Sequence, residues 1–192
     1  GKKKANSLWL WSPGKKPMLS SFTDKYNLKA AVISAVDLIK GIGICAEMET
    51  VDVEGATGTV NTNYKGKADA TIDAFKNGKD LVYLHFEGPD EHGHRGEADV
   101  KTKSIEYIDK YALSPIFSYL EECGEDFGIM ILPDHPTPVR IRTHSPEPVP
   151  YIIYSSKNTN EGIGNYNEYS CSAGKYFANG LLIFVSNFTV KK

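Results

Sequence analysis

The sequence lacks the cysteines that a disulfide framework needs. Only three occur among 192 residues, at Cys45, Cys123 and Cys171. Their number is odd, they lie far apart, and no two form a Cys-x-x-Cys pair. Neither a disulfide scaffold nor a thiolate metal knuckle is therefore indicated. This distribution fits a reducing compartment, and we expect a cytoplasmic protein.

Long apolar runs are also missing. The longest one near the C-terminal end, at residues 181–185, is far shorter than the roughly 20 residues that a membrane-spanning helix needs. The lysines at the N-terminal end are not followed by the apolar stretch of a signal peptide. We therefore expect no association with a membrane.

A strong excess of one charge is absent as well. The formal net charge is -2, from 22 basic and 24 acidic residues, and the basic residues cluster only at residues 2–4 and 191–192. The sequence gives no electrostatic reason to expect a nucleic-acid partner. No internal repeat is visible, and no feature indicates an oligomeric state.

What the sequence does contain is typical of a globular domain. Hydrophobic residues make up 41% of the chain and charged residues 24%, and the length favours a single well-buried core. Residues 1–21 are rich in turn-forming residues without a clear period, so we expect a linker or the remnant of another element there. Residues 22–192 are expected to form the domain.

Extended and helical patterns alternate from residue 28 onward. Apolar, β-branched runs predict strands, and apolar residues at helical intervals predict helices between them. The expected strands are residues 29–36, 51–53, 81–86, 127–132 and 149–154, and the expected helices are residues 35–48, 66–75 and 98–120. This alternation predicts an α/β fold of three layers, in which a mostly parallel sheet has helices on both faces.

Two of these segments carry more specific expectations. The run at residues 81–86 is mostly apolar, which predicts a strand buried on both faces. In the helix expected at residues 98–120, Pro115 should kink or divide the helix. The inner face of this helix is expected to hold Ile105, Ile108, Leu113, Ile116 and Leu120.

Four of the five histidines gather in three short segments that also hold acidic or basic residues. These segments are Asp90 to His94, Asp134-His135 and Arg142-Thr143-His144. The first two follow expected strands, and ligands of a parallel α/β sheet collect outside the carboxyl ends of its strands. Carboxylate oxygens and imidazole nitrogens both bind divalent metals, so the segments predict a hydrolytic site with one or two metal ions.

Each pair taken alone has a simpler explanation. An Asp-x-x-x-His pair is common in solvent-facing loops that bind no metal. The conjunction of two strand-end loops with a third histidine favours the metal site over that alternative.

Three longer runs of residues carry a family resemblance. They are H-x-E-x-P-D-E-x-G-H at residues 85–94, L-P-D-H-P-T-P-V at residues 132–139, and R-T-H at residues 142–144 followed by P-V-P at residues 148–150. Together they resemble the archaeal-type branch of the cofactor-independent phosphoglycerate mutases. Shorter matches at Asn6 and at residues 9–17, 55–58 and 62–67 agree with it.

The resemblance implies part of an alkaline-phosphatase-like core with two divalent metal ions, usually manganese, magnesium or zinc. It assigns Asp90, His94 and His144 to one ion. Asp134 and His135 are assigned to the other. The implied reaction interconverts 3-phosphoglycerate and 2-phosphoglycerate, which are small phosphorylated metabolites, through a serine that is transiently phosphorylated.

Basic side chains could bind the anionic groups of such a substrate. Arg142 is the best candidate, because arginine can hold both oxygens of a phosphate or carboxylate and this one lies two residues from His144. Arg140 is a weaker candidate. Lys40 and Lys67 are expected to be solvated surface residues.

The two remaining histidines of the first motif are not assigned to a metal. His92 stands where the family often has a small residue, and we expect it to face solvent. His85 lies within an apolar strand, and we expect a hydrogen-bonded core histidine.

The Asp-rich motif and the serine nucleophile that the family normally carries, with an inserted second domain after them, are not found in these 192 residues. Ser20, Ser21 and Ser34 do not match the context of the nucleophile, so none is assigned. In this interpretation residues 1–21 are a linker or the remnant of the inserted domain. Residues 22–192 are the C-terminal portion of the alkaline-phosphatase-like domain, inactive alone.

Two other hypotheses stay open. The chain could belong to another phosphotransferase or phosphatase of the superfamily, including the homoserine kinase label that this branch sometimes carries. It could also be a catalytically silent metal-binding or interaction module.

Overall fold

The computed structural model describes residues 4, 6–8, 14–158, 162 and 164–180. Residues 9–13 of the N-terminal match and the apolar run at residues 181–185 lie outside these ranges. Within them, none of the helices is long and apolar enough to cross a membrane.

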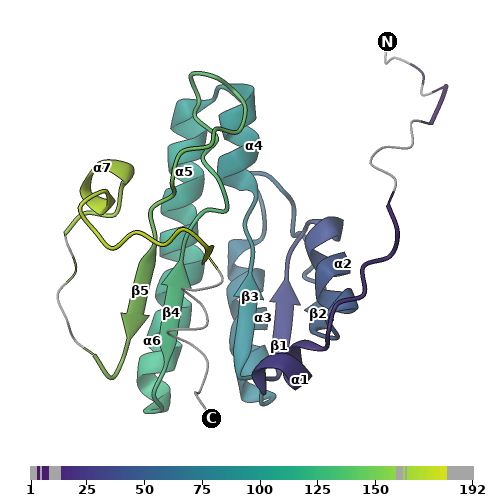
Figure 1. Ribbon diagram of the computed structural model, residues 1–192, viewed down its shortest axis with the longest axis vertical. Helices are drawn as coiled ribbons and strands as arrows, with labels where there is room; N and C mark the ends of the chain where they lie inside the picture. Colours follow the sequence, from purple (N-terminus) through teal and green to yellow (C-terminus); the bar gives the residue numbers. More distant parts are fainter. Residues whose placement is uncertain (1–3, 5, 9–13, 159–161, 163, 181–192) are drawn as a thin grey trace.

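A parallel sheet of three strands forms one half of the fold (Figure 1). Its order is β2 (Glu49–Val51), β1 (Ala30–Ile33) and β3 (Leu81–Leu84). Ala31 pairs with Glu49 on one side and with Val82 on the other. All four residues of β1 are buried, as a central strand with apolar side chains requires.

Helices cover both faces of this sheet. The chain passes from β1 through α2 (Asp37–Cys45) to β2, and then through α3 (Tyr64–Lys76) across β1 to β3. The two crossovers run in opposite directions along the sheet, and right-handed crossovers then place their helices on opposite faces. The predicted α/β fold with a parallel sheet is confirmed.

The last two strands form a second, antiparallel sheet. In it β4 (Gly128–Ile131) pairs with β5 (Ile152–Ser155), with Ile129 opposite Tyr154. The sheet was expected to be single and mostly parallel, and β5 departs from this expectation by pairing antiparallel with β4 in a separate sheet. The connection between the two strands contains no helix, whereas parallel strands are usually joined by a crossover helix. In Figure 1, β4 lies beside β3 and points the same way.

The long helix expected at residues 98–120 is three segments. They are α5 (Ala98–Ile108), a π-helical turn η1 (Asp109–Leu113) and α6 (Ser114–Cys123). Pro115 lies in the first turn of α6, directly after the π turn, so the proline falls where the regular helical bonding is interrupted. The extra residue in the π turn shifts the helical period, and Ile105, expected on the inner face, is 50% exposed.

One layer of helices supports both sheets. Ala68 of α3, Ala112 of η1 and Ile116 of α6 form a buried cluster, against which Leu84 of β3 packs. From α6, Phe117 makes edge contacts with Phe127 and Tyr154 beside β4 and β5. One layer of helices therefore packs against both sheets, although no strand pairing joins the sheets among the described residues.

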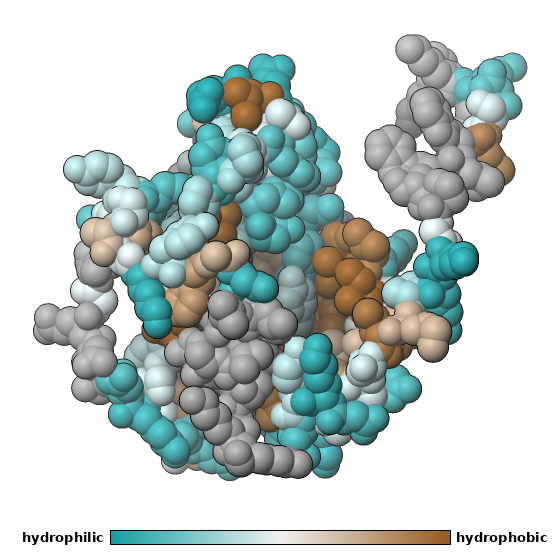
Figure 2. Space-filling model, in the orientation of Figure 1, coloured by the Kyte–Doolittle hydropathy of each residue, from teal (hydrophilic) through white to brown (hydrophobic). Residues whose placement is uncertain are grey.

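The strand β3 is less buried than its sequence suggests. Its Tyr83 is 48% exposed, so the expectation of a strand buried on both faces is wrong. Apolar side chains are also exposed on α2, among them Leu38, Ile42 and Ile44, and Figure 2 shows an apolar patch in this part of the molecule. Two short helices complete the described fold, α1 (Phe22–Tyr26) and α7 (Glu168–Cys171).

Candidate metal centre

The first ligand segment is a helix, where the sequence was expected to form a loop. α4 (Gly88–Arg95) begins with Pro89 in its first turn and ends at Gly96, which has a left-handed φ of 77°. Proline at the start and glycine after the end are the usual limits of a helix. The segment lacks apolar periodicity, which is why it resembles a loop in sequence. On a helix, the spacing of four residues places Asp90 and His94 on one face.

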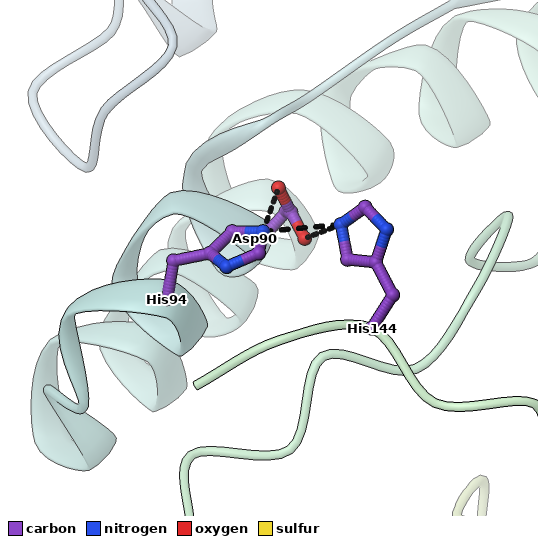
Figure 3. Close-up of side chains that lie close together, drawn as sticks. All are labelled: Asp90, His94 and His144. Atoms are coloured by element: carbon purple, nitrogen blue, oxygen red, sulfur yellow. Dashed lines mark hydrogen bonds and ion pairs between the residues drawn. The ribbon is translucent and has the colours of Figure 1, made fainter. Parts of the chain in front are cut away.

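Asp90, His94 and His144 converge, and one ligand atom from each lies within 4.8 Å of the others. The Nε2 atoms of His94 and His144 each lie 3.4 Å from an oxygen of Asp90. Figure 3 shows the carboxylate and one imidazole reaching out from α4 toward the second imidazole, which comes from a separate loop. The structure thus brings together the three residues that the resemblance assigned to one ion.

The backbone at Arg142 orients one of these histidines. The Nδ1 atom of His94 lies 3.0 Å from the carbonyl oxygen of Arg142, so Nδ1 must donate and Nε2 keeps its lone pair. Arg142 has a left-handed φ of 53°, and it is exposed. A carbonyl that holds the second nitrogen of a histidine is the usual outer support of a metal ligand.

The two imidazoles face each other closely. Nε2 of His94 lies 3.0 Å from Nε2 of His144, and two nitrogen lone pairs cannot approach to that distance without a proton or a cation between them. The carboxylate of Asp90 faces the same space. The donor set, one hard oxygen and two borderline nitrogens, fits a zinc- or manganese-like divalent ion.

The second ligand segment lies directly beside the first. Asp134 and His135 follow β4, and Nε2 of His135 lies 3.4 Å from a carboxylate oxygen of Asp134. The rings of His135 and His144 are 3.6 Å apart between centroids. Nδ1 of His135 is 4.0 Å from Asp90. All five predicted ligand residues therefore belong to one contiguous cluster.

Thr137 is part of this cluster and was not predicted from the sequence. Its hydroxyl bonds to Asp90 and lies 3.2 Å from Nδ1 of His135. It is only 4% exposed. A threonine between two prolines carries no signal of such a role in a single sequence.

His92 is buried, so the expectation that it faces solvent is wrong. It is 4% exposed, and its Nε2 accepts the N–H of Val60 at 3.2 Å. Its Nδ1 lies 2.6 Å from a carboxylate oxygen of Glu97. His92 therefore ties α4 to the loop before α3 and to the start of α5, and these contacts occupy both of its nitrogens.

His85 was expected to be a hydrogen-bonded core histidine within its strand; it is hydrogen-bonded, but it follows the end of β3 and is only partly buried. Its Nδ1 lies 3.1 Å from the hydroxyl of Ser34, which is itself buried and accepts the N–H of Val36 at 3.0 Å. Burial, and then the charge of Lys67, lower the pKa of His85. Its neutral form is favoured.

Lys67 is not the solvated surface residue that was expected. It is 1% exposed, and its ammonium group donates to the carbonyl oxygen of His85 at 2.8 Å. The same group lies 4.5 Å from the centre of the Phe86 ring. Burial lowers the pKa of Lys67 to about 8. Lys40, by contrast, forms a surface ion pair with Asp52 at 3.0 Å.

The stability of the chain should depend on pH through Lys67. Its folded pKa of about 8 lies below the usual 10.5, so between these values the unfolded chain binds more protons and stability rises with pH. Below pH 8 the full cost of burying the charge is present. We expect the free energy of unfolding to rise by on the order of 1 kcal/mol between pH 8 and 9.5.

Urea unfolding of Lys67→Met across this range measures the effect. The variant should lack the rise. Lys65→Met, on the same helix with a side chain that is 80% exposed, should keep it. A parallel rise in all three proteins would show that Lys67 is not its source.

Comparison with known proteins agrees with this geometry. A family model of the metalloenzyme superfamily matches residues 5–181. The chain belongs to the metalloenzyme superfamily. Membership implies that a divalent metal is bound, and it is consistent with the cluster of Asp90, His94 and His144.

The chain has relatives among named enzymes. It is 47% identical to the 2,3-bisphosphoglycerate-independent phosphoglycerate mutase of Methanothrix thermoacetophila over 176 residues. This matched region covers 92% of the chain and 45% of the relative. A probable enzyme of the same name from Geobacter sulfurreducens is 47% identical, covering 94% of this chain and 45% of the relative. The resemblance seen in the sequence is confirmed. The chain spans less than half the length of either relative.

Solved structures agree on the fold. A protein of Pyrococcus horikoshii matches with a TM-score of 0.73 and 33% identity, over 80% of this chain and 46% of that one. The cofactor-independent phosphoglycerate mutase of Thermoplasma acidophilum matches with a TM-score of 0.60 and 24% identity, over 84% of this chain and 36% of that one. The second likeness supports the fold alone.

Proposed function

We propose that this chain is the metal-binding part of a cofactor-independent phosphoglycerate mutase, which interconverts 3-phosphoglycerate and 2-phosphoglycerate. The observation that carries the proposal is the convergence of Asp90 and His94 with His144, 50 residues further along the chain. The names of the relatives supply the reaction. The family of the chain supplies the need for a metal.

In this proposal the site holds two divalent ions, manganese, magnesium or zinc. Asp90, His94 and His144 hold one ion, and Asp134 with His135 holds the other. Such ions neutralise the charge of a phosphoryl group and lower the pKa of a bound hydroxyl. The protein's part is to fix the ligands, and the carbonyl of Arg142 does so for His94.

Substrate recognition is proposed for Arg142. Its guanidinium lies against Gly96 at the C-terminal end of α4, where a positive charge is favoured by the helix dipole. The side chain is exposed, so it is accessible to an anionic metabolite. A membrane or nucleic-acid partner is not part of this proposal, and the cytoplasm is the proposed location.

The serine nucleophile is proposed to come from residues outside these 192. Ser34 lies near the carboxyl end of β1, but it is 3% exposed and bonded to His85. A nucleophile needs access to the phosphoryl group, which this hydroxyl lacks. Residues 1–21 are then a linker or the remnant of an inserted domain, and residues 22–192 are part of the catalytic domain.

A chimera tests the function directly. In it, this chain replaces the 176 matched residues of the Methanothrix relative. With Mn²⁺ present, we expect conversion of 3-phosphoglycerate to 2-phosphoglycerate, and a loss of at least about 100-fold in the Asp90→Asn chimera. The 192-residue chain alone should give no conversion.

Other outcomes would contradict the proposal. A folded chimera that hydrolyses p-nitrophenyl phosphate without mutase activity would identify a phosphatase. A folded chimera without either activity would identify a silent module. Conversion by the chain alone, abolished by changing one of its serines, would show that the nucleophile lies within it.

A further inference from the structure

The candidate ligands form two sets. The first set is Asp90, His94 and His144, and the second is Asp134 and His135. Thr137 lies between the two sets and touches both. Its hydroxyl bonds to a carboxylate oxygen of Asp90, from the first set, and lies 3.2 Å from Nδ1 of His135, from the second. The residue is 4% exposed, so water has little access to compete for these bonds.

The direction of the two hydrogen bonds follows from the donors available. An ionised carboxylate can only accept, so the single hydroxyl proton of Thr137 points to Asp90. The hydroxyl oxygen must then accept from His135, which requires the proton of that ring on Nδ1. For the neutral ring, this hydrogen-bond network assigns the tautomer, and it leaves Nε2 of His135 with a free lone pair, 3.4 Å from the carboxylate of Asp134.

The backbone of Thr137 is held by two further contacts. The ammonium group of Lys101 in α5 donates to its carbonyl oxygen at 2.7 Å. Gly93 of α4 is packed so tightly here that a Cβ on it would lie 2.6 Å from the same oxygen. The backbone that carries the hydroxyl is therefore held by contacts with both α4 and α5.

We propose that Thr137 is a positioning residue that couples the two ligand sets. It orients the carboxylate of Asp90 and sets the tautomer of His135 through one hydroxyl group. This inference rests on the proposed function, because it presumes that both sets bind ions. Its consequence is that an ion held by Asp90 also favours the arrangement of His135 that binds a second ion.

Valine is the matched substitution, because it keeps the shape of threonine and removes the hydroxyl. In titrations of the 192-residue chain with Zn²⁺, Thr137→Val should weaken binding by on the order of tenfold. Thr137→Ser restores the hydroxyl and should bind within about threefold of the parent. Thr102→Val, an exposed threonine of α5 whose hydroxyl bonds only to Ala98 within the helix, is the control and should bind like the parent.

A second probe separates a change in the arrangement of the ligands from a general loss of stability in the Thr137→Val variant. With Co²⁺ as the probe, the visible absorption reports the arrangement of the ligands, so Thr137→Val should change the spectrum while Thr137→Ser retains it. If Thr137→Val binds Zn²⁺ and Co²⁺ like the parent, the inference is overturned and the proposed function stands. If the parent itself binds neither ion, it is the metal site of the proposed function that fails.

A measurement on the unaltered chain keeps the inference testable if the valine variant does not fold. Nitrogen-15 shifts of the histidine rings distinguish the two neutral tautomers. We expect His135 to carry its proton on Nδ1. A proton on Nε2 would rule out the hydrogen bond to Thr137 in this direction, and with it the proposed coupling.

Discussion

Asp90→Asn should lower the affinity of the chain for Mn²⁺ or Zn²⁺ by on the order of 100-fold. Asp90 lies 3.4 Å from His94, 3.4 Å from His144 and 4.0 Å from His135, so it is the one carboxylate of the described cluster that contacts all three imidazoles. Asparagine keeps the size of the side chain and removes the negative charge. Titration calorimetry on the 192-residue chain measures the change.

The neighbouring Glu91→Gln is the matched control. Glu91 lies on the same helix but pairs with Arg95 at 3.1 Å, so its loss should leave the affinity within about twofold, as for a surface charge. An equal loss in both variants would show that the general charge of α4, and not a site at Asp90, attracts the ion.

The same titration compares the two ligand sets. The first set has three protein ligands in this chain, which is a sufficient number for a catalytic zinc ion, and the second has only two. We therefore expect one tightly bound ion, and a larger loss of affinity for His144→Ala than for His135→Ala. Two equivalent ions, or equal losses, would contradict this order of the sites.

Gly93→Ala should destabilise the chain by about 1–3 kcal/mol and weaken ion binding with it. Gly93 is buried in α4 between Asp90 and His94, and an added Cβ would lie 2.6 Å from the carbonyl oxygen of Thr137 and 3.0 Å from its methyl carbon. The backbone of α4 must move away from the segment at residues 134–144. That movement separates Asp90 and His94 from His144.

Gly41→Ala provides the opposite expectation. Gly41 lies inside α2, and a Cβ there would meet no atom within 4 Å. Alanine favours a helix over glycine, so this variant should be more stable by about 0.5–1 kcal/mol. Urea unfolding and Zn²⁺ titration of both variants check the pair. Unchanged stability and affinity in Gly93→Ala would show that α4 does not need this close contact.

That the aspartate- and histidine-bearing segments form a metal site could be predicted because two of them follow expected strands, whereas the two ligand sets were implied only by the family resemblance. Asp90 and Asp134 each follow an apolar run, and parallel strands bring such positions to one edge. The helix that holds Asp90 could not be predicted from the sequence, because α4 is short and its apolar residues have no helical period. It is limited by Pro89 and Gly96 instead, which are equally common in loops.

The burial of two polar side chains, His92 and Lys67, could not be predicted from the sequence. His92 and Lys67 are polar residue types that usually lie at the surface or only partly buried. Both are buried here, because Glu97 accepts a hydrogen bond from His92 and the carbonyl of His85 accepts one from Lys67. These partners are contributed by tertiary packing. Likewise, the antiparallel pairing of β5 depends on a connection of irregular backbone, whose path the apolar pattern does not encode.

The interruption between the two sheets has a consequence for the behaviour of the chain in solution. Among the described residues, β3 pairs only with β1 and β4 pairs only with β5, so each strand has one edge whose N–H and C=O groups form no ladder. Unpaired edges are templates for intermolecular β-pairing. The outer edges of β2 and β5 are likewise without a partner strand among the described residues, and the interruption adds the edges of β3 and β4, so at high concentration the 192-residue chain should self-associate.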